Sequence, residues 1–197
     1  MIRDAVEKSF IVLFIFELLI PAVLPGAIGR TVQAVLAYIC SCEVRKGREP
    51  DQKEKKNILS ESMNVFSMGL PAAAIGAYNL LFGSEAAQEI MIEEFIFAAL
   101  SEEIIFRGII FEILLRALTG QGSSGKWTAL LLSSVLFGFA HLFNWKYSGA
   151  ACIRQAIYTV FLGCYFGIVY MKTDSVRDPI LLHIIINFTY ALRIKNI

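Results

Sequence analysis

The sequence has no excess of charge of either sign, and it has few cysteines. Its 197 residues include 18 Lys and Arg and 17 Asp and Glu, which gives a net charge of +1. This balance gives no support for nucleic-acid binding by bulk electrostatics. The four cysteines contain no Cys-x-x-Cys pair, so we expect buried apolar thiols and not a disulfide framework. Internal repeats are also absent, which disfavours a proton-coupled transporter built from inverted repeats.

Hydrophobic residues, in contrast, are abundant. They make up 56% of the chain, whose mean hydropathy is +0.61, whereas a soluble domain is usually about 45–50% apolar even when glycine is counted. The apolar residues form blocks about as long as a membrane span. We therefore predict an all-α fold, a multi-pass transmembrane helical bundle of about seven helices (six to eight).

Seven apolar segments have the length of helices. We expect helices at about residues 6–24, 28–44, 58–82, 86–118, 126–143, 150–171 and 179–194. The loop at residues 43–57 is rich in Lys and Arg, and the positive-inside rule places it in the cytoplasm. Alternation of the spans then puts a flexible glycine connector, residues 120–125, on the same side. We predict one integral membrane domain, with N-terminal transmembrane helices over residues 1–85 and a helical core over residues 86–197.

Three charged residues lie deep within the fourth of these segments. A charged side chain near the bilayer centre costs roughly 2.5–3.5 kcal/mol on insertion scales, so such residues are expected to have a function. Glu103 and Arg107 are spaced i,i+4 and share a helix face, where we expect a buried ion pair that fixes helix packing. Glu102 points about 100° away from Glu103 and is not compensated by that pair. Its profile is that of a general base or acid, with a neutral hydrogen-bonding carboxylic acid as the alternative.

Both histidines of the chain also lie inside apolar segments. His141 follows Phe137 by one helical turn, and His183 precedes Asn187 by one turn. A cavity lined by these groups and Glu102 could activate a water for hydrolysis, with the imidazoles and the amide orienting the water or stabilising an oxyanion. The alternative is a zinc site with Glu102, His141 and His183 as ligands, although no His-Glu-x-x-His motif is present.

These polar residues form three short motifs in a fixed order. The motifs are Glu102-Glu103-x-x-x-Arg107, Phe137-x-x-x-His141 and His183-x-x-x-Asn187. They resemble the signature of the CPBP family, named for CAAX proteases and bacteriocin-processing enzymes and also called the Abi family. The resemblance covers roughly residues 91–187, and it implies an intramembrane endopeptidase whose catalytic core lies within residues 86–197.

Roles for the motif residues follow from the resemblance. It implies that Glu102 is the base, that His141 and His183 are catalytic, and that Asn187 orients water or the oxyanion. The supporting residues would be Glu103, Arg107 and Phe137. The family has been described both as metallo-type and as glutamate-type. We favour the glutamate type without a required cofactor, because the arginine-bearing face next to Glu102 disfavours a dication, and zinc is the alternative.

The resemblance also sets expectations about partners and location. The substrate is expected to be a membrane-associated peptide or protein, and the bilayer itself is the other partner. The small size resembles prokaryotic members, so the expected location is the plasma membrane of a prokaryote, where a prenylated substrate is less expected. The alternative function is a non-proteolytic scaffold or a bacteriocin-immunity protein of the same fold.

Overall fold

Every element in the described part of the chain is helical. The structure, a computed structural model, describes residues 2–24, 26–46 and 92–194. The elements are α1 (Ile2–Leu13), the π-helix η1 (Phe14–Leu19), α2 (Ile20–Val23), α3 (Gly26–Arg45), α5 (Ile92–Glu103), the π-helix η2 (Ile104–Phe111), α6 (Glu112–Leu118), η3 (Thr119–Gln121), α7 (Gly122–Ala140), η4 (His141–Asn144), α8 (Trp145–Ser148), α9 (Ala151–Thr173) and α10 (Arg177–Ile194). The helix predicted at residues 58–82 lies outside the described residues.

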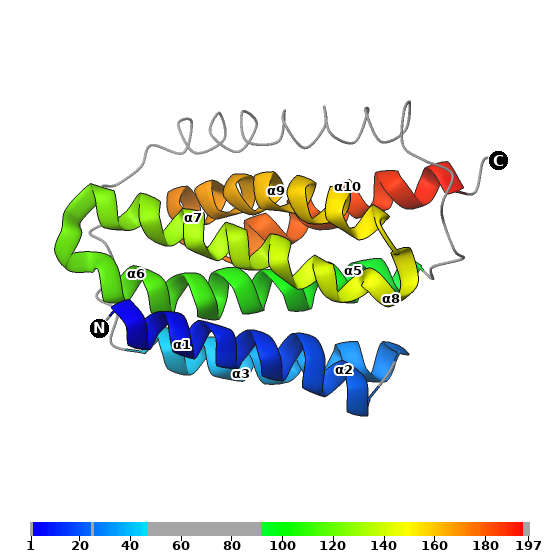
Figure 1. Ribbon diagram of the computed structural model, residues 1–197, viewed down its shortest axis with the longest axis horizontal. Helices are drawn as coiled ribbons and strands as arrows, with labels where there is room; N and C mark the ends of the chain where they lie inside the picture. Colours follow the sequence, from blue (N-terminus) through cyan, green and yellow to red (C-terminus); the bar gives the residue numbers. More distant parts are fainter. Residues whose placement is uncertain (1, 25, 47–91, 195–197) are drawn as a thin grey trace.

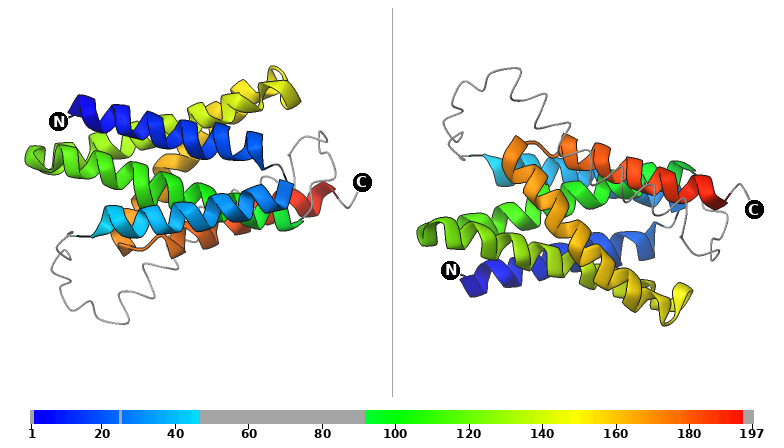
Figure 2. Two further views of the ribbon diagram at one scale, coloured as in Figure 1. Left: turned by 90° about the horizontal axis from the view of Figure 1, so that it is seen from below. Right: turned by 90° about the horizontal axis from the view of Figure 1, so that it is seen from above.

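The rod made of α5, η2 and α6 lies at the centre of the fold. Figure 1 shows α1 to α3 below it and α7, α9 and α10 above it, with the start of α1 and the end of α10 at opposite ends of the bundle. All eight residues of η2 are buried. The two views of Figure 2 show that α9 runs obliquely across α7 and α10. The all-α prediction is confirmed for the described residues, and the seven-helix count and domain division stay predictions.

Two of the described helices are long and apolar enough to cross a membrane. They are Gly122–Asn144, which combines α7 with η4, and Ala151–Thr173, which is α9, and each has a mean hydropathy of 1.4. The other described helices do not pass this test of length and composition. The predicted multi-pass topology is therefore supported only in part by composition.

Basic side chains gather at the end of the bundle where α1 begins and α3 ends. Helices α6 and α9 also end there, so segments that are far apart in the sequence meet at this end (Figure 1). Arg45 forms an ion pair of 3.4 Å with Asp174, and Arg116 donates a hydrogen bond of 3.2 Å to the carbonyl of Lys46. The connector at residues 120–125 lies at this same end.

The glycine connector is shorter and more ordered than predicted. α7 begins at Gly122, four residues before the predicted start, and only the 3-10 turn η3 separates it from α6. A Cβ atom added to Gly125 would lie 2.1 Å from the carbonyl oxygen of Leu118. The glycine at this position therefore permits a close approach of two helix ends, and the prediction of a flexible linker is wrong here.

Small residues bring α7 and α9 into close contact. A Cβ atom on Gly138 would lie 2.4 Å from a methyl carbon of Val160 and 2.6 Å from the carbonyl oxygen of Ala156. On the facing helix, a Cβ atom on Gly163 would lie 3.0 Å from the backbone of Ser134. Small residues of this kind let helix backbones approach within a bilayer as well as in water. The contact fixes the position of α9, which supplies part of the candidate site.

Candidate active site

Glu103 occupies the centre of a buried polar cluster. Its Oε1 atom accepts hydrogen bonds from Nδ1 of His183, at 2.8 Å, and from Nη1 of Arg107, at 3.1 Å. The side chain of Glu103 is 0% exposed, and that of Arg107 is 2% exposed. Arg107 also donates a hydrogen bond of 3.1 Å to the carbonyl of Gly163. The predicted Glu103–Arg107 pair is present, and it connects η2 with α9 and α10 as well.

The second oxygen of Glu103 has only an ionic contact. Its Oε2 lies 3.1 Å from Nη1 of Arg107 but accepts no hydrogen bond within the described residues. A carboxylate that is buried with one hydrogen-bonded oxygen depends on the neighbouring cation for its stability. Loss of Arg107 would therefore leave a buried carboxyl group without its cationic partner.

The π-helix η2 begins immediately after Glu103. A π-helix has i→i+5 hydrogen bonds, and such segments are frequent at functional sites. Its widened turn leaves backbone carbonyls available to other donors, and the hydroxyl of Ser133 on α7 donates to the carbonyl of Phe106 at 3.1 Å. Gly108 lets α3 approach, because a Cβ atom there would meet that of Ser41 at 3.0 Å. These contacts hold the rod on both sides of Arg107.

Glu102 lies on the side of the His183 ring that faces away from Glu103. The Oε2 atom of Glu102 is 4.0 Å from Nε2 of His183, and its side chain is 14% exposed. This separation is beyond direct hydrogen-bond distance, and polar groups so placed are commonly bridged by water. Since Nδ1 of the imidazole faces Glu103, His183 lies between the two glutamates. The structure thus brings Glu102 and His183 together, as predicted.

His141 joins the cluster through an aromatic ring. It is the first residue of η4, just after α7, and its Nδ1 lies 2.9 Å from the carbonyl oxygen of Phe137. A carbonyl can only accept, so Nδ1 carries the proton and Nε2 is free to accept in the neutral ring. The ring of Phe137 is 4.9 Å from that of His141 and 6.1 Å from that of His183. Phe137 therefore contacts both imidazoles, and within the described residues His141 has no hydrogen bond or ion pair with Glu102.

Asn187 lies one turn beyond His183 on α10 and is half-buried. Both side chains therefore belong to the same face of the last helix, as their spacing predicted. The amide can donate from its NH₂ group, which a carboxylate in this position could not do. Its predicted role in orienting water or an oxyanion stays a prediction.

Two contributions to this region were not predicted from the sequence. Phe166 on α9 stacks on the imidazole of His183 with a centroid distance of 4.9 Å and an interplanar angle of 24°. A single phenylalanine in an apolar helix carries no sequence signal for such a role.

The N-terminal helices make the second contribution. Gln33, which is 0% exposed, donates to the carbonyl of Phe16 at 2.9 Å and to the carboxylate of Glu17 at 3.1 Å. Glu17 lies close enough to Glu102 for electrostatic repulsion between the two carboxylates. The sequence signal was the presence of Glu and Gln inside otherwise apolar helices.

The zinc alternative finds little support in this geometry. The described residues contain no group of three or more His, Cys, Asp and Glu side chains that could hold a metal ion. Glu103 is held by Arg107 and His183, and Glu102, His141 and His183 do not gather into such a group. The donor set does not fit a three-ligand zinc site, and we derive no step through a metal.

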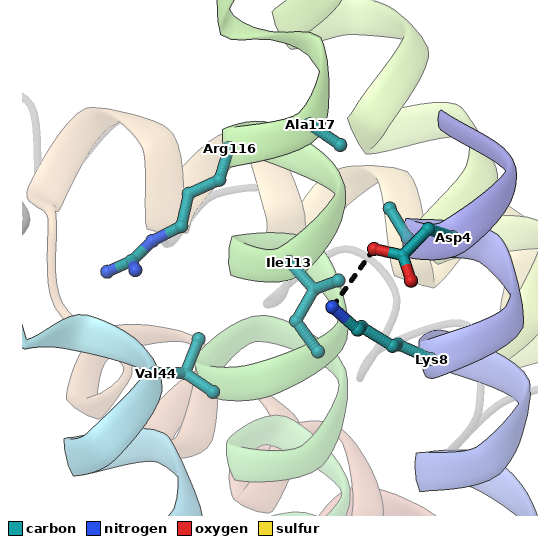
Figure 3. A pocket seen from close by; sticks show the side chains of 7 residues that line it. Asp4, Lys8, Val44, Ile113, Arg116 and Ala117 are labelled. Carbon is teal, nitrogen blue, oxygen red and sulfur yellow. Dashed lines mark ion pairs between the residues drawn. The ribbon is translucent and has the colours of Figure 1, made fainter. Parts of the chain in front are cut away.

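A pocket in the described part of the chain lies away from these residues. It has a volume of about 330 Å³ and is lined by residues of α1, α3 and α6. Figure 3 shows Lys8 and Asp4 of α1, joined by an ion pair, facing Ile113 and Ala117 across it. None of the predicted site residues lines this pocket.

A model of the type II CAAX prenyl endopeptidase Rce1-like family matches residues 90–189. The chain therefore belongs to this family, as the resemblance of its motifs predicted. The matched segment contains Glu102, Glu103, Arg107, Phe137, His141, His183 and Asn187. Neither a curated protein nor a solved structure matches the chain.

Proposed function

We propose that this protein is an intramembrane endopeptidase that hydrolyses a peptide bond through a water activated by Glu102. The observation that carries the proposal is the position of His183, whose two ring nitrogens face Glu103 at 2.8 Å and Glu102 at 4.0 Å. A base whose nearest neighbour is an imidazole oriented by a third group has the arrangement expected for general acid–base catalysis. Family membership supports the reaction class.

The proton positions follow from the hydrogen bonds of His183. The ionised Glu103 accepts from Nδ1–H, so the neutral ring presents the lone pair of Nε2 toward Glu102. A water between Glu102 and Nε2 would donate one hydrogen to each and direct an oxygen lone pair at the substrate. Glu102 takes the proton as the oxygen attacks the scissile carbonyl, and the same proton later passes to the leaving amine. The water supplies both the attacking oxygen and the proton of the leaving amine, so neither step needs a further reactant.

Charge also develops on the substrate during this reaction. The tetrahedral intermediate carries an oxyanion, which needs hydrogen-bond donors that are already in place. The amide of Asn187 supplies such a donor from the same face of α10 as His183. His141 is the second candidate, since protonation of its Nε2 would make it a donor as well. Glu103 and Arg107 take no part in proton transfer and hold the imidazole.

We also propose that the bundle spans the membrane several times. Large apolar side chains are exposed on four helices, only one of which, α9, is among the two apolar spans. They include Phe10, Ile11, Phe14, Ile28, Val35, Leu36, Ile153, Ile157, Phe161, Leu181, Ile185 and Phe188. Exposed apolar surface of this extent is typical of contact with lipid. Because α1, α3, α9 and α10 all contribute, the lipid-facing surface surrounds the central rod.

Two tryptophans mark where this surface ends. Trp127 and Trp145 are 58% and 56% exposed, near opposite ends of the segment formed by α7 and η4. They lie about 27 Å apart along the axis at ~1.5 Å per residue, close to the ~30 Å hydrocarbon thickness of a bilayer. Tryptophan is enriched at both membrane–water interfaces. The site residues between them would then lie within the hydrocarbon region.

The experiment uses purified protein in liposomes and an internally quenched peptide that ends in a farnesylated CAAX sequence. The family name suggests this substrate, and the same peptide without the prenyl group is the comparison. We expect cleavage by the wild-type protein and loss of cleavage in Glu102→Gln with unchanged amounts of folded protein. Full activity in Glu102→Gln would contradict the mechanism. Cleavage of neither peptide by the wild-type protein would contradict the assignment of a CAAX-type substrate.

A further inference from the structure

We propose that Phe166 is a positioning residue that sets the orientation of the His183 imidazole. The proposal rests on the function proposed above, because it concerns the same imidazole. Phe166 is 0% exposed and stacks on that ring at 4.9 Å and 24°, which is close to parallel. Phe166 also lies outside the three sequence motifs and on a different helix from each of them.

An imidazole needs such a neighbour because its own torsion does not fix its plane. The χ2 angle of histidine is broad and roughly two-fold. The hydrogen bond from Nδ1 to Glu103 restrains χ2 only as far as that bond resists bending and stretching, so the ring can still rock about its Cβ–Cγ bond. Such a rotation would move Nε2 away from Glu102, at present 4.0 Å distant. A flat ring stacked on the face of the imidazole opposes this rotation.

A second aromatic ring restricts the imidazole from another direction. Phe137 meets His183 edge-on, with a centroid distance of 6.1 Å and an angle of 85°. The guanidinium carbon of Arg107 lies 4.7 Å from the centroid of Phe137 and 5.3 Å from that of Phe166. The two phenylalanine rings therefore contact both partners of Glu103, the cation and the imidazole.

The position of Phe166 is itself well determined. Gly163, three residues earlier on the same face of α9, accepts the hydrogen bond from Arg107. One face of α9 thus supplies a carbonyl to the arginine and an aromatic ring to the histidine. Because the close contact between Gly163 and Ser134 fixes α9 against α7, the ring of Phe166 has little freedom to shift. The structure assigns to α9 the task of orienting both groups that bind Glu103.

Nuclear magnetic resonance can test this directly, because the chain has only two histidines. Protein labelled with ¹⁵N-histidine gives two imidazole spin systems, and His141→Gln assigns the remaining one to His183. We expect the Nδ1 proton of His183 to resonate far downfield in the wild-type protein, as in a hydrogen bond to a carboxylate. In Phe166→Leu this resonance should broaden or move upfield, while the His141 signals stay unchanged.

Matched variants separate positioning from a general loss of packing. Phe166→Tyr keeps the ring and should keep the His183 signal. Phe111→Leu removes another buried ring, which is 1% exposed and packs edge-on against Tyr170 with no described ring contact to His183, and it should also leave the signal unchanged. Should Phe166→Leu fail to fold, Phe166→Met replaces it, because methionine fills a similar volume without a planar face. An unchanged His183 resonance in the variant without the ring would overturn the proposal.

Turnover provides the second measurement. Phe166→Leu is expected to lower kcat about 10- to 100-fold with little change in KM, since a misplaced catalytic group can cost about 10²-fold. Phe166→Tyr should restore most of kcat. Equal losses in Phe166→Leu and Phe111→Leu would mean a structural role only. The resonance experiment does not depend on cleavage, so it decides the role of Phe166 even if the proposed peptidase activity is not found.

Discussion

Glu103 and His183 lie 80 positions apart in the sequence, and a hydrogen bond of 2.8 Å joins them in the structure. The second glutamate of the pair therefore orients the imidazole, while the first faces its other nitrogen at 4.0 Å. Adjacent residues on one helix thus have different partners and different roles. Glu103 is fully buried and is bound by Arg107 and His183, whereas Glu102 keeps some exposure and forms no ion pair with an arginine of the described segments.

The two glutamates should consequently respond differently to the same substitution. Glu102→Gln should abolish cleavage and leave the thermal unfolding temperature close to that of the wild-type protein. Glu103→Gln should lower that temperature as well, since removing one partner of a buried ion pair costs about 3–5 kcal/mol. Thermal unfolding in detergent and peptide cleavage would be measured for both variants. Equal loss of activity with unchanged stability in both would mean that the glutamates share the chemistry.

Asn187 should affect the rate of the chemical step more than substrate binding. Removing one oxyanion donor typically costs about 10²–10³-fold in kcat. We therefore expect Asn187→Ala to lower kcat by about this factor with a small change in KM, as steady-state kinetics on the quenched peptide would show. A rise in KM with an unchanged kcat would instead assign Asn187 to substrate binding.

The contact between α7 and α9 should not tolerate an added methyl group. In Gly138→Ala, the new Cβ atom would overlap Val160 and the carbonyl of Ala156. Overpacking of this kind typically costs about 1–3 kcal/mol. The control is Gly120→Ala, where no atom lies within 4 Å of the new Cβ position. Similar unfolding temperatures for both variants would show that α9 can move away from α7 at little cost.

Chelation should distinguish the glutamate mechanism from the zinc alternative. With water activated by Glu102, cleavage should continue in full after treatment with a strong chelator. A zinc enzyme would lose activity on chelation and regain it when zinc is added. Elemental analysis of the purified active protein provides the companion measurement. Stoichiometric zinc that is lost together with activity would overturn the metal-free proposal.

Local spacing predicted those features of the site that belong to a single helix. The Glu103–Arg107 pair and the shared face of His183 and Asn187 follow from i,i+4 geometry, which does not depend on the rest of the fold. The helices were likewise predicted from apolar runs, and the described ones begin and end within a few residues of the expected positions. Family motifs supplied the remaining candidates.

Contacts between helices could not be predicted in the same way. The bond between Glu103 and His183 depends on how α5 packs against α10, and no local pattern encodes that packing. Phe166 was missed because a stacking ring and an ordinary core phenylalanine look the same in sequence. The start of α7 was misplaced because the glycines were interpreted as a flexible linker, whereas Gly125 permits a close approach to Leu118.

The π-helix between Glu103 and Glu112 also affects how this chain can change over evolution. One additional residue in a helix rotates everything beyond it by about 100°. The glutamates before η2 and the residues of α6 after it therefore do not lie on one continuous face of a single helix. Deleting one residue from Ile104–Phe111 would restore an uninterrupted α-helix and turn Glu112 away from its hydrogen-bond partner Tyr170. The side chains before η2 and those after it therefore face directions that one uninterrupted α-helix would not give them together.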